Sequence, residues 1–452
     1  MERLEKINND FSALFEAGKQ LLDPGRNETV DRSRCAASER FLKRGIPHKT
    51  EAYIYTDFLP VLDRDYRVVL NYSTGNIDVN RLFRCNISDL SVHLVFTVNG
   101  CYDRNNSNDL PEGVVVCSLG EAQTLYPELL ERHYDRLAVA SGDGFADLNT
   151  MLAKDGVFVY IPPRTILNRP LQIINLLYSD ADLMAFQRNL IIVGERAAAS
   201  VLVCDHTVTN FNYWVDTLTE IVTEKGAELN FYQVENQHSE ASQVNSVFVE
   251  QAAGSVFNSN MITLYGGLVR NNIYVRLTGE GAYAGLSGAY LMDKNQKVDN
   301  FTSVEHMAPR CTSEEHYKGI LDDHALGNFS GSIKVYPNAQ HTEAYQANDN
   351  LLLTDTARIN SKPQLIIDAD DVKCSHGATV GQIDEEAVFY LKSRGIDADE
   401  AKTMMMFGFV NDIVRKVNIP ALREEVGVLV ERRLRGEISK CANCVLGCEN
   451  RV

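Results

Sequence analysis

The 452-residue sequence lacks several features that would each point to a large class of proteins. No apolar stretch reaches the roughly 20 residues that a membrane-spanning helix needs. Residues 1–10 contain no apolar segment typical of a signal peptide. Basic residues are outnumbered, with 44 against 61 acidic ones and a net charge of −17. We therefore expect a cytoplasmic protein that binds neither membranes nor nucleic acids, since both of those surfaces attract cationic proteins.

Two further absences concern chemistry. The phosphate-binding sequence Gly-x-x-x-x-Gly-Lys-Ser/Thr does not occur, so any ATP would have to be hydrolysed by a partner. The ten cysteines are scattered along the chain and follow no export signal. This pattern predicts reduced thiols rather than a framework of disulfides.

What is present divides the chain into helical and strand-rich parts. Residues 1–83 have mainly helical periodicity, beginning with a helix expected from Phe11 to Leu22. Residues 84–383 consist of short apolar or alternating runs typical of strands, with a helical insert expected at about 120–154. Residues 384–440 are again helical in pattern. The sequence thus predicts helices, a long β core and then more helices.

A small-residue pattern recurs within the strand-rich part. It places glycines at 194, 226, 254 and 281, at steps of 27 to 32 residues. This interval lies in the range of solenoids and other repeat proteins. A tight corner followed by alternating side chains is what one coil of a parallel β-helix requires. An ordinary β-sandwich with glycine turns is the alternative.

The segment 373–384 contains the most informative pair of side chains. Cys374 and His376 are two residues apart, so an extended strand would place both on one face. The small residues Gly377 and Ala378 follow and allow close approach of another backbone. Imidazole and thiolate suit zinc, copper or iron–sulfur chemistry. Two ligands do not complete a metal site, so other groups would have to contribute.

Together with residues 385–396, this segment resembles the hallmark of the SufB/SufD family, the scaffold subunits of the SUF iron–sulfur cluster assembly machinery. The Cys-Ser-His string at 374–376 is most like SufD, because SufB-like chains usually carry a Glu-His-Glu-Ala-type string there. The resemblance extends over almost the whole chain, and further matching segments lie at 44–47, 146–150, 267–272, 298–302, 317–321 and 361–363.

The resemblance implies a mainly β fold, with a right-handed parallel β-helix flanked by N-terminal and C-terminal α-helical domains. It implies a scaffold without catalytic activity, paired with SufB and with the ABC-type ATPase SufC. His376 is the implied ligand of iron or of a transient iron–sulfur cluster shared with SufB, and Cys374 is the weaker candidate. A flavin is associated with the family's complex, but no residue here locates one.

SufC is expected to dock on the C-terminal helices. Met404, Met405 and Phe407 are the expected contact residues, because adaptable methionines suit a surface that repacks. Simple packing of these side chains on the β core is the alternative interpretation.

The final segment, 441–452, is rich in cysteine. Cys441, Cys444 and Cys448 form a C-x-x-C followed by C-x-x-x-C, which resembles half of a zinc or iron–sulfur site. A fourth ligand would have to come from another group or chain. The alternative is an exposed, redox-sensitive tail without metal.

Other groups of potential ligands fit structural roles better. His306, Cys311, His316 and His324 have spacings of five, five and eight, which match neither a helix face nor a zinc finger.

Two other functions stay open. One is a β-helix enzyme acting on polysaccharides, with acidic pairs at 322–323 and 370–371. The other is a homodimer that works without SufB.

Overall fold

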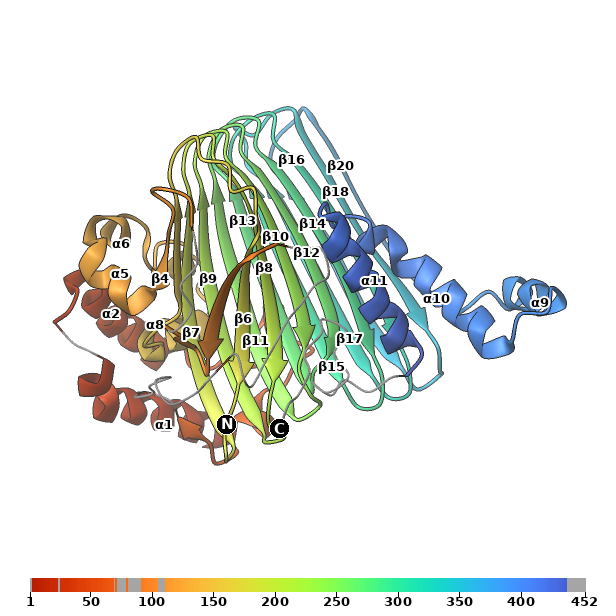
Figure 1. Ribbon diagram of the computed structural model, residues 1–452, viewed down its shortest axis with the longest axis horizontal. Helices are drawn as coiled ribbons and strands as arrows, with labels where there is room; N and C mark the ends of the chain where they lie inside the picture. Colours follow the sequence, from red (N-terminus) through yellow and green to blue (C-terminus); the bar gives the residue numbers. More distant parts are fainter. Residues whose placement is uncertain are drawn as a thin grey trace.

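The computed structural model describes residues 2–22, 25–68, 91–104 and 110–436, together with Leu70 and Val79. Its centre is a parallel β-solenoid in which successive strands alternate between two facing sheets (Figure 1). Helices lie at the N-terminal and C-terminal ends of the chain. The prediction of a mainly β, parallel solenoid flanked by helices is therefore confirmed, and a β-sandwich is excluded.

Sheet A runs from the edge strand β19 to β4. Its strands are β19 (Arg358–Ile367), β17 (Leu326–Val335), β15 (Lys297–His306), β13 (Leu268–Leu277), β11 (Ala241–Gln251), β9 (Tyr213–Thr223), β7 (Leu183–Val193), β5 (Val157–Ile161) and β4 (Val115–Ser118), and β1 (Arg67–Val68) also pairs with β7.

Sheet B runs from the edge strand β20 to β3. Its strands are β20 (Val372–Gly381), β18 (Thr342–Leu352), β16 (Thr312–Leu321), β14 (Tyr283–Met292), β12 (Val256–Tyr265), β10 (Glu228–Asn236), β8 (Ala198–Thr207), β6 (Leu171–Leu177), β2 (His93–Val98) and β3 (Cys101–Tyr102). From β8 to β20, paired residues are 27 to 31 positions apart, which is the length of one coil.

Rows of identical or similar side chains fill the space between the sheets. Because neighbouring strands pair in register, residues of the same type stack on one another from coil to coil. One such row in sheet A consists of branched aliphatic residues, namely Ile191, Ile221, Val249, Val275, Val304, Ile333 and Leu365. Burial of these apolar side chains stabilises the solenoid.

The glycine repeat expected from the sequence matches the corners of the solenoid in three coils but not in the first of the four. The corner residue has a left-handed backbone at Gly226, Gly254 and Gly281, with φ of 65°, 63° and 70°. In the preceding coil this position belongs to Arg196 (φ 56°) and not to Gly194. Gly194 is required for another reason, since a Cβ there would lie 2.7 Å from the backbone nitrogen of Pro163.

The N-terminal helices are α1 (Glu2–Gly18), α2 (Glu28–Arg44) and α3 (Leu59–Leu62), with short 3-10 turns η1 (Lys19–Leu22) and η2 (Glu51–Tyr53). The first helix therefore begins before Phe11. The expected single insert is divided into α5 (Leu119–Leu125), α6 (Pro127–His133), α7 (Ala138–Ser141) and α8 (Gly144–Leu152). Pro127 starts a new helix, and Asp135 has a left-handed backbone (φ 58°) that prevents continuation.

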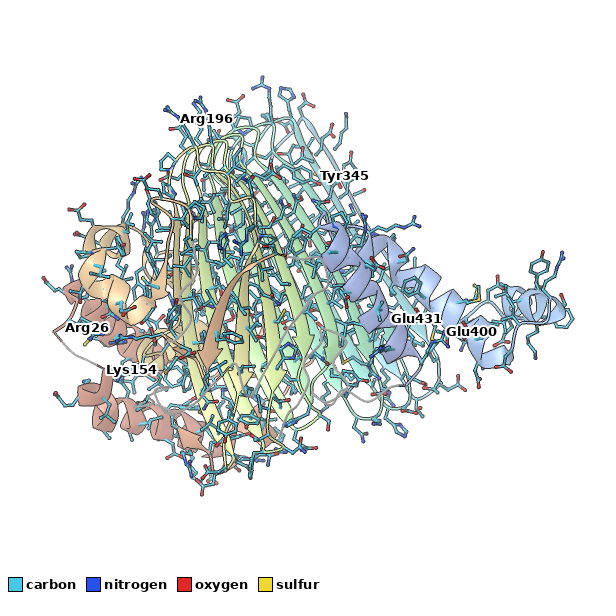
Figure 2. All side chains as sticks on the ribbon, in the orientation of Figure 1. Arg26, Lys154, Arg196, Tyr345, Glu400 and Glu431 are labelled. Carbon is cyan, nitrogen blue, oxygen red and sulfur yellow. The ribbon has the colours of Figure 1, made fainter. Side chains whose placement is uncertain are left out.

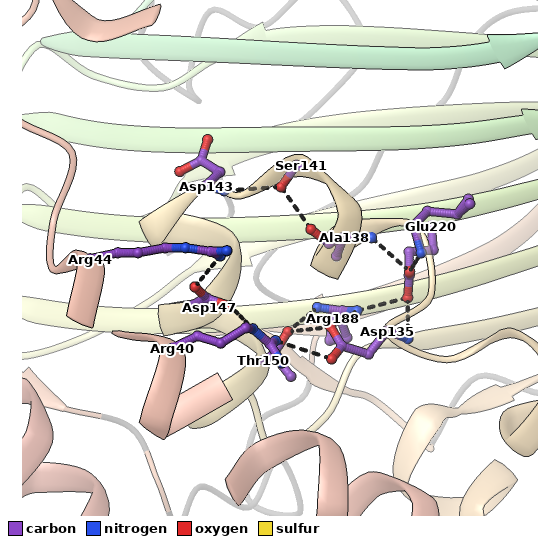
Figure 3. Close-up of polar contacts among 11 residues, drawn as sticks. Arg40, Arg44, Asp135, Ala138, Ser141, Asp143, Asp147, Thr150, Arg188 and Glu220 are labelled. Atoms are coloured by element: carbon purple, nitrogen blue, oxygen red, sulfur yellow. Dashed lines mark hydrogen bonds and ion pairs between the residues drawn. The ribbon is translucent and has the colours of Figure 1, made fainter. Parts of the chain in front are cut away.

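A buried ionic network joins these helices to the outer face of sheet A (Figure 3). Arg188 on β7 lies 2.7 Å from Glu220 on β9, and its other terminal nitrogen donates to Thr150 of α8 at 2.7 Å. Arg40 of α2 donates to Asp147 of α8 at 2.6 Å. Neither Arg188 nor Glu220 has any exposed side-chain surface. A buried pair of this kind fixes the position of the helices, because separating the charges there would be costly.

The C-terminal helices are α9 (Glu385–Ser393), α10 (Ala398–Val414) and α11 (Pro420–Leu434). Apolar residues of α10 and α11 cover the outer face of sheet B. Arg435 pairs with Glu400 of α10 at 2.6 Å and with Glu431 of α11 at 2.8 Å, which links the two helices. Figure 2 labels the two glutamates. Helix α9 packs on α10 and projects away from the solenoid (Figure 1).

Within the described residues, no helix is long and apolar enough to cross a membrane.

Candidate metal site at the open end of the solenoid

Both sheets end on the same side of the molecule. Strands β19 and β20 are the last members of sheets A and B, and each has a paired strand on one side only among the described residues. The apolar side chains of Ile366, Ile367 and Val380 are exposed there. The last coil therefore leaves the interior of the solenoid open at this end.

Cys374 and His376 both lie on β20, as the strand prediction required. Cys374 pairs in register with Ala344 of β18, and His376 pairs with Gln346. Since Ala344 and Gln346 are buried between the sheets, the two β20 residues occupy the same inward-facing rows. The structure thus places both residues on one face of the final strand, above the interior of the solenoid.

The two side chains differ in exposure. His376 is exposed, whereas Cys374 is half-buried and packs against the main interior cluster. Burial raises the pKa of the Cys374 thiol, although a backbone contact with Ala344 offsets part of this shift. A thiol that resists deprotonation is a poorer ligand than an accessible imidazole. His376 is therefore the better placed of the two donors.

Polar side chains continue inward from His376. Glu315, Gln346 and His376 form one row on adjacent strands β16, β18 and β20. Thr302 of sheet A donates to the Glu315 carboxyl at 2.6 Å. Burial raises the pKa of Glu315 to about 7, while the Thr302 and Gln346 contacts lower it. Glu315 and Gln346 have no signal in the sequence, because only the strand register brings them into the row of His376.

The row of His306, Cys311, His316 and His324 does not form a ligand cluster. His306 is buried between the sheets and bonds Ser313 at 2.9 Å, and burial lowers its pKa to about 4. His316 lies on the outer face of sheet B, 3.0 Å from Asp349. Across the described ranges, no group of three or more His, Cys, Asp or Glu side chains could hold a metal ion. An ion at His376 would thus need additional donors.

The predicted partner-binding residues lie in different environments. Met404 is 47% exposed, whereas Phe407 is partly buried and packs on the apolar cluster beneath α10. Two residues that the sequence analysis missed are more prominent, since Phe389 and Tyr390 on α9 are 72% and 57% exposed. The apolar run of α9 was visible in the sequence, but its projection from the solenoid was not.

The remaining predicted residues are placed as follows. Cys441, Cys444 and Cys448 lie outside the described residues. Asp323 and Asp371 sit at corners, where Asp323 accepts from the Lys294 backbone at 3.0 Å and Asp371 pairs with His341 at 2.9 Å. These contacts give the corner acids a structural role. No described residue is assigned to a flavin.

Two family descriptions match the chain over most of its length. "SUF system FeS cluster assembly, SufBD core domain" matches residues 176–409, and "SufBD protein N-terminal region" matches residues 5–173. The chain belongs to the SufBD family. The resemblance stated from the motif at 374–376 is therefore confirmed, and the family is one of iron–sulfur cluster assembly by the SUF system.

Individual relatives agree with this assignment. An iron-sulfur cluster assembly SufBD family protein of Synechocystis is 25% identical over 455 residues, which covers 97% of this chain and 96% of the relative. The iron-sulfur cluster assembly protein SufD of Escherichia coli is 37% identical over 178 residues, or 39% of this chain and 42% of that protein. The chloroplastic protein ABCI7 of Arabidopsis thaliana is 28% identical over 328 residues, which covers 70% of this chain and 68% of that protein.

Proposed function

We propose that this chain is the SufD-like subunit of a cytoplasmic SUF scaffold. It pairs with a SufB-like chain through β19 and β20 and presents His376 as a ligand for iron or for a forming cluster. The observation that carries this proposal is the exposed imidazole on an inward-facing row of β20, the strand at the edge of sheet B.

The open end favours a protein partner of similar architecture. Edge strands carry unpaired backbone donors and acceptors, which another strand can satisfy. The exposed Ile366, Ile367 and Val380 would be covered by the same contact. A SufB-like solenoid would also bring its own ligands opposite His376. A site divided between two chains can release its product when the chains separate.

The C-terminal helices supply a second contact surface, formed by Phe389, Tyr390 and Met404, for a SufC-like ATPase. These side chains are apolar and exposed, and α9 carries two of them away from the solenoid (Figure 1). Since the sequence holds no phosphate-binding loop, ATP hydrolysis belongs to the partner in this proposal. Movement of the ATPase would reach the open end through α10, which packs on β14 and β16.

A test in living cells uses His376→Ala with His324→Ala as the matched control. His324 is also exposed, but it lies at a corner of the solenoid. We expect cells that depend on His376→Ala to lose maturation of iron–sulfur enzymes, while His324→Ala supports it and both variants stay folded. Normal maturation with His376→Ala would contradict the ligand role. A stable homodimer that excludes the SufB-like chain would contradict the pairing.

A further inference from the structure

A groove of about 500 Å³ lies between sheet B and the connection from α10 to α11. Its floor is formed by β12, β14, β16 and β18, and residues 415–418 of the connection form one wall. The side chains of the floor belong to the outer face of the sheet, so the groove is separate from the interior row that ends at His376. Its volume is in the usual range for sites that bind small molecules.

The floor of the groove is hollowed at a glycine. One row of paired residues crosses the four strands and consists of Asn258, Gly285, Glu314 and Tyr345. A Cβ built on Gly285 would lie 2.7 Å from Asn258 Oδ1 and 3.2 Å from the ring of Tyr283. The glycine therefore leaves a space between its neighbours that any other residue would narrow.

The wall of the groove is fixed to the sheet by hydrogen bonds. The backbone N–H of Asn418 donates to the Tyr232 hydroxyl at 3.3 Å. From the sheet, Asn260 Nδ2 donates to the carbonyl oxygen of Ile413 at 2.9 Å. Val417 is buried beneath the connection. Because the wall is already ordered, a ligand would bind here without first having to order the chain.

Two cations line this wall, in a chain whose net charge is −17. Lys416 Nζ lies 3.9 Å from the Glu314 carboxylate, and both side chains are about half exposed. Arg415 has no ion pair within the part of the chain that the structure describes. The C-terminal end of α10 favours cations nearby, but it does not require a groove beside them. A guanidinium offers parallel N–H donors that match the oxygens of a phosphate.

An aromatic ring and a carboxylate continue the groove away from the cations. Tyr345, labelled in Figure 2, is 40% exposed and pairs in register with Glu314. An exposed aromatic ring is a platform on which a nucleobase can stack. A carboxylate binds the ribose hydroxyl in dinucleotide-binding folds. Ring, carboxylate and cations thus follow one another in the order of base, sugar and phosphate.

We propose that this groove binds a nucleoside phosphate. The base stacks on Tyr345, the ribose hydroxyls donate to Glu314, and the phosphate groups lie against Arg415 and Lys416. The site binds the nucleotide without hydrolysing it. A bound nucleotide would join the α10–α11 connection to sheet B, so its concentration would act on the C-terminal helices. This inference does not depend on a metal ion at His376 or on a SufB-like partner.

Isothermal titration calorimetry of the full-length chain with ADP, GDP and UDP tests the site. We expect at least one of the three to bind with a Kd below about 1 mM. Tyr345→Ala should weaken the binding of that nucleotide and of its nucleoside by about tenfold or more, because both lose the stacked ring. Arg415→Gln should weaken the nucleotide by about tenfold or more and leave the nucleoside unchanged, because only the nucleotide carries phosphate.

The matched controls are Tyr55→Ala and Arg310→Gln. Tyr55 is 39% exposed and lies in the N-terminal region, and Arg310 is exposed at a corner of the solenoid. Both variants should bind the nucleotide as the natural chain does. Tyr345 and Arg415 are also exposed, so their variants should unfold at nearly the natural temperature. Weaker binding would then not reflect unfolding.

Four results would overturn the inference. The first is a natural chain that binds none of the three nucleotides below about 1 mM. The second is inorganic phosphate that binds as tightly as the nucleotide, which would show an anion site only. The third is unchanged nucleotide binding by both Tyr345→Ala and Arg415→Gln. The fourth is a hexaglutamate peptide that binds as tightly and with the same dependence on Arg415, which would show a groove for an acidic peptide.

Discussion

Gln243 donates to Glu235 across the interior of the solenoid, with 2.7 Å between Nε2 and Oε1. The two residues lie on opposite sheets, and Glu235 also accepts from Asn271 at 3.0 Å. The carboxyl is fully buried, and its hydrogen-bond donors are neutral. Burial therefore raises the pKa of Glu235 to about 8, and the nearby Asp205 carboxyl adds to the shift.

The stability of the protein should consequently depend on pH. Glu235 holds its proton in the folded state up to about pH 8, whereas an unfolded chain releases it near 4.5. The folded state thus binds the proton more tightly, and this contribution to the free energy of unfolding falls as pH rises from about 4.5 to about 8. The decline should approach roughly 1 kcal/mol per pH unit.

Glu235→Gln removes this titration while keeping the shape of the side chain. Urea unfolding measured between pH 5 and pH 8.5 should show a smaller decline for the variant than for the natural chain. If the free energy of unfolding falls equally with pH in the variant and in the natural chain between pH 5 and pH 8.5, Glu235 is ionised in the folded protein. Glu240→Gln is the control, because Glu240 follows the same strand but is exposed.

Helix α9 offers a test of the second contact surface. Phe389→Glu should reduce co-purification with a SufC-like ATPase by about tenfold or more, because it places a charge in an apolar contact. The free energy of unfolding should change by less than about 0.5 kcal/mol, since Phe389 is 72% exposed. Leu125→Glu on α5, where the side chain is 63% exposed, should leave the complex intact. An undiminished complex with Phe389→Glu would place the contact elsewhere.

The cysteine-rich tail is tested by truncation. We propose that Cys441, Cys444 and Cys448 contribute to a metal site completed by another group. Chains ending at Lys440 should then lose metal that the full-length protein retains under anaerobic, reducing conditions, as measured by elemental analysis. Replacing the three cysteines with serine should have the same effect as truncation. Equal metal contents would show that the tail binds none.

The solenoid was predictable from its corners, but only in part. Gly226, Gly254 and Gly281 mark successive corners because glycine adopts a left-handed backbone at little cost. The same conformation is taken by Arg310 (φ 58°) and His341 (φ 60°) in later coils. Those residues give no such signal in the sequence. The repeat was therefore visible in the middle of the core and hidden near the open end.

The candidate site was also predictable only in part. Cys374 and His376 were found because a spacing of two places them on one face of any strand. Glu315 and Gln346 lie 61 and 30 positions before His376, and only the coil length and the strand register bring them into the same row. Nothing in their local sequence distinguishes them from exposed polar residues. Pairing between distant segments is the information that a single sequence did not supply.

The central claim is that His376 helps to hold iron or a cluster at an interface with a SufB-like chain. Its most direct test is anaerobic co-purification of this chain with SufB-like and SufC-like partners, followed by reconstitution with iron and sulfide. We expect visible thiolate-to-iron absorbance in the complex, and loss of that absorbance with His376→Ala while the complex still assembles. An unchanged spectrum in the assembled His376→Ala complex would contradict it.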